Sequence, residues 1–271
     1  MDVLSDTLAV PDGRLYYELR GEGPLIALIG APMDADAFAP LADLLARDHQ
    51  VLTADPRGVK RSVLHDPGRD SSPESRADDL AALIAHVGTG PAAALGSSGG
   101  AVTALAFAQR HPSSATTVVA HEPPLTELLP DREEQRRQTA ALVAAAASGD
   151  RLGAWRLFFA QANIGMPEEL LVEWFGGEPE PQAARDERYW FAHELPATVG
   201  WTPDAARLRE GGARIVPGIG AESTGQLCER TATALGELLR AEPVRFPGDH
   251  TGFVDHPEEF AARLRDVLSL G

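Results

Sequence analysis

Ser98 has the sequence context of a serine that acts as a nucleophile. It lies in Gly96-Ser97-Ser98-Gly99-Gly100, which fits the pattern G-x-S-x-G. Such a serine projects from a sharp, strained turn between a strand and a helix, and a neighbouring base takes its proton. The residues two positions away must be small, because strand and helix approach closely there. Ser98 has glycines at both of those positions and Ser97 does not, so Ser98 is the predicted nucleophile.

His250 is the histidine best placed to act as that base. It follows Gly248-Asp249 directly after a predicted strand and precedes the last predicted helix. The carboxyl ends of parallel strands lie at one edge of a sheet, where ligand sites of α/β proteins form. We therefore expect His250 and Ser98 on the same side of the sheet.

The elements that must position these residues alternate between strands and helices. Short apolar runs that end at Gly, Pro or Asp predict strands, and apolar residues at helical spacing predict helices. The predicted strands are Thr7–Val10, Arg14–Leu19, Leu25–Ile29, Gln50–Ala54, Ala92–Leu95, Thr116–Ala120, Arg214–Pro217 and Val244–Phe246. The helices predicted between them are Ala37–Arg47, Ser75–Val87, Ala101–Arg110, Gly225–Leu239 and Pro257–Leu270. This order predicts an α/β fold with a mainly parallel sheet flanked by helices.

The alternation is interrupted between residues 125 and 203, where only helices are predicted. They are Asp131–Ser148, Arg151–Ala162, Glu168–Phe175 and Gln182–His193. We predict an α/β core over 1–124 and 204–271, and a helical insertion over 125–203. All four tryptophans lie in the insertion. Because ligand sites are mostly apolar and often lie between domains, we expect Trp155, Phe159 and Trp190 to contact a substrate.

Four motifs in register resemble the α/β-hydrolase superfamily over nearly the whole chain. The resemblance is carried by the segment Ile29–Phe38, the turn Asp55-Pro56-Arg57-Gly58, the elbow at Ser98 and the loop Gly248-Asp249-His250. It implies an α/β-hydrolase fold with a helical cap formed by the insertion, and a serine catalytic triad.

The resemblance also implies an oxyanion hole, formed by the backbone N–H groups of Ala31 and Gly99. Such donors stabilise negative charge on the carbonyl oxygen of a substrate. The segment departs from the family pattern at Ile29, where a histidine is common, and at Met33, where a glycine is common. Backbone groups form the hole, so these changes affect the shape of the pocket. Met33 and Ser97 are predicted to contact the substrate.

Two glutamates compete for the third position of the triad. The family's usual acid position, in Gly220-Ala221-Glu222-Ser223, holds Ser223, and Glu222 stands one residue early. Glu122 follows the strand after the nucleophile helix, and some members of the family carry their glutamate there. We favour Glu122 and keep Glu222 as the alternative. The acid would fix the histidine tautomer and stabilise the imidazolium.

The predicted function is a serine hydrolase that cleaves a carboxylic ester, thioester or lactone of an apolar small molecule through an acyl-enzyme. Two alternatives remain open on the same fold. One is a non-hydrolytic enzyme, namely a lyase, a cofactor-free oxygenase or a perhydrolase. The segment Ala35-Asp36-Ala37-Phe38 resembles the corresponding loop of perhydrolases. The other is a ligand-binding receptor.

The composition narrows the partners. The 271 residues carry 24 Lys and Arg against 40 Asp and Glu, a net charge of −16, which disfavours nucleic acid and anionic membranes. We expect a small-molecule substrate, and the sequence does not indicate an oligomeric state. Phosphate-binding glycine loops and metal-ligand motifs are absent, so no cofactor or metal is expected. The single cysteine and the lack of a leader-like segment predict a cytoplasmic protein.

Overall fold

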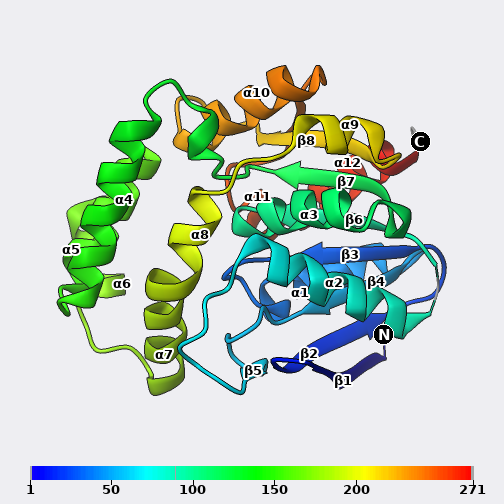
Figure 1. Ribbon diagram of the computed structural model, residues 1–271, viewed down its shortest axis with the longest axis horizontal. Helices are drawn as coiled ribbons and strands as arrows, with labels where there is room; N and C mark the ends of the chain where they lie inside the picture. Colours follow the sequence, from blue (N-terminus) through cyan, green and yellow to red (C-terminus); the bar gives the residue numbers. More distant parts are fainter. Residues whose placement is uncertain (1, 89, 270–271) are drawn as a thin grey trace.

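A mixed β-sheet forms the centre of the molecule (Figure 1). The computed structural model describes residues 2–88 and 90–269, and within them nine strands join one sheet. The strands are β1 (Val3–Val10), β2 (Gly13–Arg20), β3 (Leu25–Ile29), β4 (Gln50–Ala54), β5 (Val63–Leu64), β6 (Ala92–Ser97), β7 (Ala115–His121), β8 (Arg214–Gly220) and β9 (Val244–Phe246). Their order is β1-β2-β4-β3-β6-β7-β8-β9, with β5 paired to β2. The pairs from β4 to β9 are parallel, and those that involve β2 are antiparallel.

Helices cover both faces of the sheet. One face packs against α2 (Pro73–Val87), α3 (Gly99–Arg110), α9 (Ala205–Glu210) and α10 (Leu227–Leu239). The other packs against α1 (Ala39–Leu45), α11 (Gly252–Asp255) and α12 (Pro257–Ser269). Strand β3 serves both faces, because alternate side chains point to opposite sides: Ala27 joins the first cluster, and Ile26 and Leu28 join the second. This arrangement confirms the predicted fold class.

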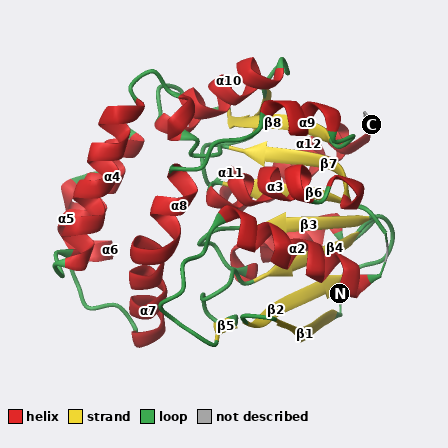
Figure 2. Cartoon of the chain, viewed as in Figure 1, coloured by secondary structure: helices red, strands yellow, loops and turns green. Residues whose placement is uncertain are grey.

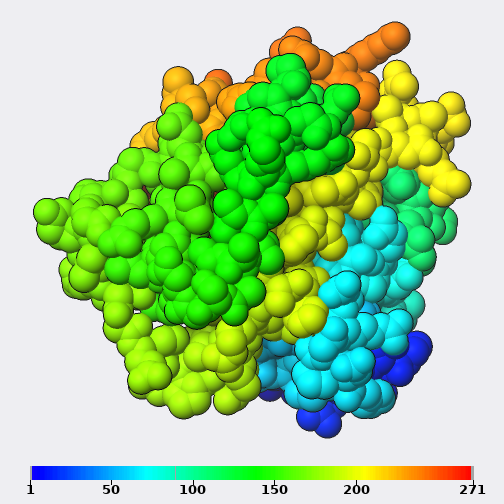
Figure 3. Space-filling model, turned by 60° about the vertical axis from the view of Figure 1, so that its left-hand side comes forward, coloured from blue at the N-terminus to red at the C-terminus, as the bar shows by residue number. Residues whose placement is uncertain are grey.

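Between β7 and β8 the chain forms a second group of helices. They are η3 (Thr126–Leu128), α4 (Arg132–Ala147), α5 (Arg151–Ala162), α6 (Glu168–Phe175), α7 (Pro181–Tyr189), the π-helical turn η4 (Trp190–Glu194) and α8 (Leu195–Val199). All of them fall within residues 125–203, which we call the insertion. The arrowheads of β3 and β7 point toward it (Figures 1 and 2). In the space-filling view, the insertion, in green to yellow, forms the left and central part of the face shown, beside the cyan and blue N-terminal part of the core (Figure 3).

Two predicted helices differ from those observed, and proline accounts for both. The helix predicted over 37–47 is divided into the 3₁₀ turn η1 (Ala35–Phe38), capped by Asp34, and α1, whose first turn holds Pro40. The helix predicted over 182–193 ends at Tyr189 and widens into η4. Pro196 cannot donate a hydrogen bond to the carbonyl of Ala192, and its ring needs extra room beside that carbonyl.

Some elements were not predicted at all, namely β5, η2 (Pro112–Ser114), η3, α8, α9 and α11, and each has at most six residues. The final predicted helix extends to Leu270, which lies outside the described residues. Among the described residues, none of the helices has both the length and the apolar character that crossing a bilayer requires.

Candidate active site

Ser98 occupies a strained turn between β6 and α3. Its φ is 56° and its ψ is −125°, a combination that residues with a side chain rarely adopt. Its backbone N–H donates to the carbonyl of His121 on β7 at 3.0 Å, and its own carbonyl accepts from Ala101 at 3.0 Å. The turn is therefore held by both the neighbouring strand and the helix that it starts.

The two glycines that flank this turn are required by close backbone contacts. A Cβ on Gly96 would lie 2.2 Å from the carbonyl oxygen of Gly100. A Cβ on Gly100 would lie 2.0 Å from the carbonyl oxygen of Ile29, at the end of β3. Any larger residue at either position would force β6, α3 or β3 apart. The geometry thus explains the spacing from which Ser98 was predicted.

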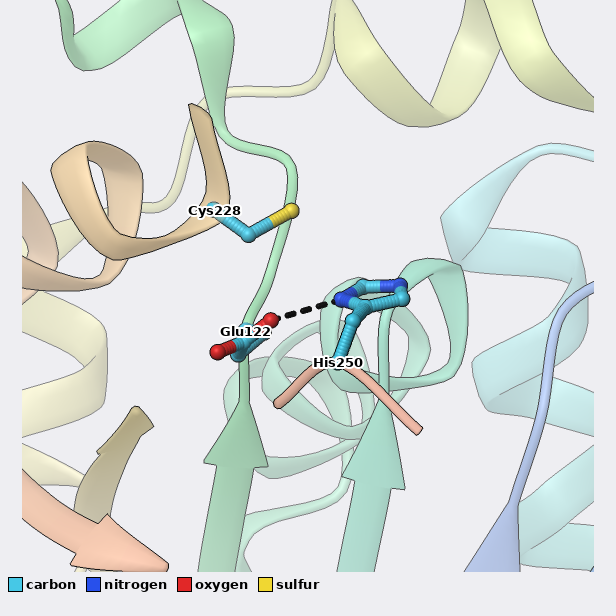
Figure 4. A group of neighbouring side chains, drawn as sticks. All are labelled: Glu122, Cys228 and His250. Atoms are coloured by element: carbon cyan, nitrogen blue, oxygen red, sulfur yellow. Dashed lines mark hydrogen bonds and ion pairs between the residues drawn. The ribbon is translucent and has the colours of Figure 1, made fainter. Parts of the chain in front are cut away.

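Glu122 and His250 form a hydrogen-bonded pair at the same edge of the sheet (Figure 4). Glu122 follows β7, has a φ of 52° and is fully buried. Its Oε2 lies 2.7 Å from His250 Nδ1, and its Oε1 accepts the backbone N–H of Gly220 at 2.8 Å. Nε2 of His250 points away from Glu122. The backbone N–H of Gly220 therefore holds the carboxylate in place, and the carboxylate orients the imidazole.

The alternative acid, Glu222, is not part of this pair. Its side chain is exposed, and its backbone N–H donates to the carbonyl of Gly248 at 2.9 Å. The neighbouring Ser223 is fully buried and carries a hydroxyl rather than an acid. Of the two glutamates that the sequence left open, the structure brings Glu122 to His250 and leaves Glu222 at the surface.

The pairing shifts the pKa values of both groups. Burial would raise the pKa of Glu122, but the hydrogen bond and the charge of His250 lower it to about 2. Burial would lower the pKa of His250, but its contacts with Cys228 and Glu122 raise that pKa well above the usual value of 6.5. Glu122 is therefore a carboxylate at neutral pH, and it favours the protonated form of His250.

Cys228, near the start of α10, lies beside this pair (Figure 4). One ligand atom each from Glu122, Cys228 and His250 lies within 4.8 Å of the others, a spacing that a metal ion could bridge. The His250 nitrogen and the Glu122 oxygen concerned already share a hydrogen bond. A metal would have to displace that bond, so the pair is better suited to proton transfer than to metal binding.

The loop after β3 brings Ala31 against the start of α3. A Cβ on Gly99 would lie 2.5 Å from the carbonyl oxygen of Ala31, so the two backbones are in contact. Asp55, directly after β4, fixes the position of this loop. Its carboxylate accepts hydrogen bonds from the backbone N–H of Ala35 at 3.0 Å and from the guanidinium of Arg61. As the first residue of α3, Gly99 has a backbone N–H with no partner inside the helix. The two amides predicted to bind an oxyanion are thus near each other.

Ser97 does not contact the cavity beside Ser98, contrary to our prediction. It is fully buried, and its Oγ lies 3.0 Å from Nδ1 of His121. His121 is enclosed edge-on by Phe246 and Phe260, and burial lowers its pKa to about 4. Ser98 directly follows Ser97, and Glu122 directly follows His121. The neutral Ser97–His121 pair therefore supports the backbone at both Ser98 and Glu122.

We expect Ser97→Ala to reduce the free energy of unfolding by about 1–3 kcal/mol, because it leaves a buried histidine nitrogen without its partner. Urea unfolding measures this change. Ser113→Ala is the matched control: Ser113 is exposed in η2, and its removal should change stability by less than about 0.5 kcal/mol. Equal effects of the two substitutions would show that the Ser97–His121 bond contributes nothing.

A cavity of about 520 Å³ opens beside Ser98, between the sheet edge and the insertion. Ser98, Gly99, Ala31 and His250 line one side of it. Aromatic and aliphatic side chains of the insertion line the other side, chiefly Phe158, Phe159, Ile164, Met166, Trp174 and Trp190. Phe159 and Trp190, which we predicted to contact a substrate, both line this cavity.

Two further residues predicted to contact the substrate lie away from the cavity lining. Met33 packs against the cluster between the sheet and α1. Trp155 lies behind the cavity wall, where it stacks on Trp190 with ring centroids 5.4 Å apart and on Phe175 at 4.4 Å. Trp155 supports the aromatic wall from outside.

Several cavity residues escaped the sequence analysis. Ile164 and Met166 lie in the loop between α5 and α6, and Thr198 lies in α8. Gln226, Cys228, Asp249, Thr251 and Asp255 complete the side near His250. For Asp249 and Thr251 the sequence offered one signal, because both are adjacent to His250 in the chain.

Arg76 on α2 links the insertion to α3, the helix that begins directly after Ser98. The buried guanidinium donates to Thr103 Oγ1 on α3 at 2.8 Å and to Thr198 Oγ1 on α8 at 2.9 Å. The buried carboxylate of Glu194 lies 4.0 Å away. Thr103 in turn donates to the carbonyl of Gly99. The wall of the cavity formed by α8 is therefore fixed relative to Ser98.

The comparisons with known proteins agree with this fold. Residues 23–210 match the family described as alpha/beta hydrolase fold, and the chain belongs to that family of hydrolases. An uncharacterized hydrolase of Bacillus subtilis (strain 168), YraK, is 32% identical over 281 residues, which cover 99% of this chain and 97% of the relative.

Two solved structures have the same fold. An alpha/beta hydrolase from Sphaerobacter thermophilus DSM 20745 has a TM-score of 0.71 and 26% identity, over 97% of this chain and 100% of the other. Est816, described as an N-acyl homoserine lactone degrading enzyme, has a TM-score of 0.71 and 20% identity, over 96% and 99% of the two chains.

Proposed function

We propose that this α/β hydrolase is a serine hydrolase that cleaves a carboxylic ester, thioester or lactone of an apolar small molecule. The observation that carries the proposal is the buried Glu122–His250 pair at the cavity into which the strained Ser98 turn opens. The apolar wall favours an apolar acyl or alcohol group.

In the proposed mechanism, Ser98 Oγ attacks the carbonyl carbon while Nε2 of His250 takes the hydroxyl proton. The carbonyl oxygen becomes an oxyanion that accepts hydrogen bonds from the N–H groups of Ala31 and Gly99. The bond to the leaving group then breaks, and His250 gives its proton to the departing alkoxide or thiolate. Water attacks the acyl-enzyme, again with His250 as base, and releases the acid and the free serine. Glu122 stabilises the imidazolium in both steps.

A fluorophosphonate probe tests for the activated serine. We expect one adduct per chain, which tandem mass spectrometry assigns to Ser98 rather than Ser97. With p-nitrophenyl butyrate we expect a burst of nitrophenol and an acyl adduct on the intact protein. A folded protein that neither reacts with the probe nor hydrolyses p-nitrophenyl esters and thioesters would contradict the proposed function. Turnover only with added peroxide would favour perhydrolysis.

The pH dependence of ester hydrolysis follows from the pKa of His250. Only the neutral imidazole can accept the serine proton, so activity falls as the pH drops through that pKa. Because the Glu122 pair and the Cys228 contact raise it, we expect kcat/KM to rise with pH with a midpoint above 6.5. A pH profile of p-nitrophenyl butyrate hydrolysis measures this midpoint. A midpoint below 6.5 would mean that burial outweighs the carboxylate.

A further inference from the structure

The cavity beside Ser98 has an unbalanced set of charges. Its charged lining consists of Asp249 and Asp255 together with His250, and in the described part of the chain no lysine or arginine lines it. All of the other residues that line it are uncharged. The charge of a protonated His250 is offset by the carboxylate of Glu122, with which it is paired. A ligand that enters therefore meets the two aspartates and no arginine or lysine that could bind an anion.

The two carboxylates are not neutralised by neighbours. Asp249 Oδ1 accepts the backbone N–H of Thr251 at 2.9 Å and lies 3.0 Å from its hydroxyl oxygen, and Asp255 Oδ2 lies 2.7 Å from the same oxygen. Thr251 has one hydroxyl proton, so it can donate to only one of them at a time. Neither aspartate takes part in an ion pair within the described residues. Both negative charges thus remain at the cavity.

The aromatic wall of the cavity also disfavours anions. Phe158, Phe159, Trp174 and Trp190 present aromatic rings, whose faces attract cations and repel anions. A carboxylate placed against this wall would lose its water without gaining a partner, which is costly. A trimethylammonium or alkyl group would not incur this cost.

We propose that the cavity selects its substrates by charge, taking neutral or cationic acyl donors and excluding those that carry a carboxylate. This inference rests on the proposed function, because it names the substrate class of the same site. Near the surface, a like charge several ångströms away costs on the order of 1–2 kcal/mol, and salt screens part of it. That cost corresponds to a discrimination against the anion of roughly five- to thirtyfold.

Three p-nitrophenyl esters of similar length test the selection: the heptanoate, the hemiadipate and the 5-(trimethylammonio)pentanoate. We expect kcat/KM for the hemiadipate to be at least about fivefold below that for the heptanoate, and the difference to become smaller in high salt. The cationic ester should match or exceed the neutral one. Hydrolysis of the hemiadipate at the rate of the heptanoate would overturn the proposal.

A pair of variants assigns the effect to the cavity. Asp255→Asn should narrow the ratio between the neutral and the anionic ester several-fold. Asp266→Asn changes the net charge equally, but Asp266 is exposed on α12 and does not line the cavity, so the ratio should stay as in the native protein. Equal effects of the two variants would assign the selection to net charge and overturn its origin in the cavity.

A binding measurement separates this inference from the proposed function. Trp174 and Trp190 line the cavity, so their fluorescence should report phenylbutanol, phenylbutylammonium and phenylbutyrate without any hydrolysis. Weaker binding of phenylbutyrate alone supports charge selection even if every ester proves inert, in which case only the proposed function fails. Equal binding of all three overturns the selection even if esters are cleaved.

Discussion

Alanine in place of Ser98 is expected to lower p-nitrophenyl butyrate hydrolysis by roughly 10⁴- to 10⁶-fold and to abolish fluorophosphonate labelling. The substitution removes the atom that would form the acyl bond, and no other residue can supply it at that point of the turn. The residual activity should come from the amides of Ala31 and Gly99 and from binding in the cavity. Steady-state kinetics, together with intact-protein mass spectrometry for the acyl adduct, measure the loss.

The adjacent Ser97→Ala variant is the control for this result. It removes a hydroxyl one residue away, from a side chain that faces His121 and not the cavity. We expect it to retain probe labelling, although the protein is less stable. If Ser98→Ala kept its activity within tenfold of the native protein, the nucleophile would have to be another group, and the acyl-enzyme mechanism would be wrong.

The residues with strict local requirements were the ones that the sequence could predict. Gly96 and Gly100 are fixed by backbone contacts, so their spacing identified the turn. The apolar strand Leu25–Ile29, buried on both faces of the sheet, was predicted with the observed bounds. In both cases the structure restricts the residue type at fixed positions along the chain, and the sequence therefore records the constraint.

The directions of the side chains at the site were harder to predict from the sequence. Ser97 lies two residues after Leu95 on β6, so both point to the face that packs against α12. The alternation of side chains along β6 could have predicted this direction only if the sequence had shown which face of the sheet packs against α12. Trp155, Phe158 and Phe159 share one side of α5, but only the packing of α6 and η4 determines where along that helix the cavity ends. How far the cavity extends along α5 therefore depends on contacts between segments that are distant in the sequence.

Glutamine in place of Glu122 is expected to reduce kcat by about 10³- to 10⁴-fold while the protein stays folded. The native carboxylate accepts two hydrogen bonds, from Gly220 N–H and from His250 Nδ1–H. A glutamine of the same shape has one oxygen and one NH₂ group. If its oxygen faces Gly220, its NH₂ group faces Nδ1 and holds His250 in the tautomer whose Nε2 is protonated. That Nε2 cannot take a proton from Ser98.

The matched control is Glu222→Gln, at the exposed glutamate that competed for the same role. Both variants remove one negative charge, but only Glu122 contacts His250, so Glu222→Gln should change kcat less than about twofold. The two variants should also differ in pH profile. Loss of the Glu122 carboxylate removes a charge that raises the His250 pKa, so the midpoint of any residual activity should move to lower pH. A small effect of Glu122→Gln with a large effect of Glu222→Gln would assign the triad acid to Glu222 and require the loop around Gly248 to rearrange in solution.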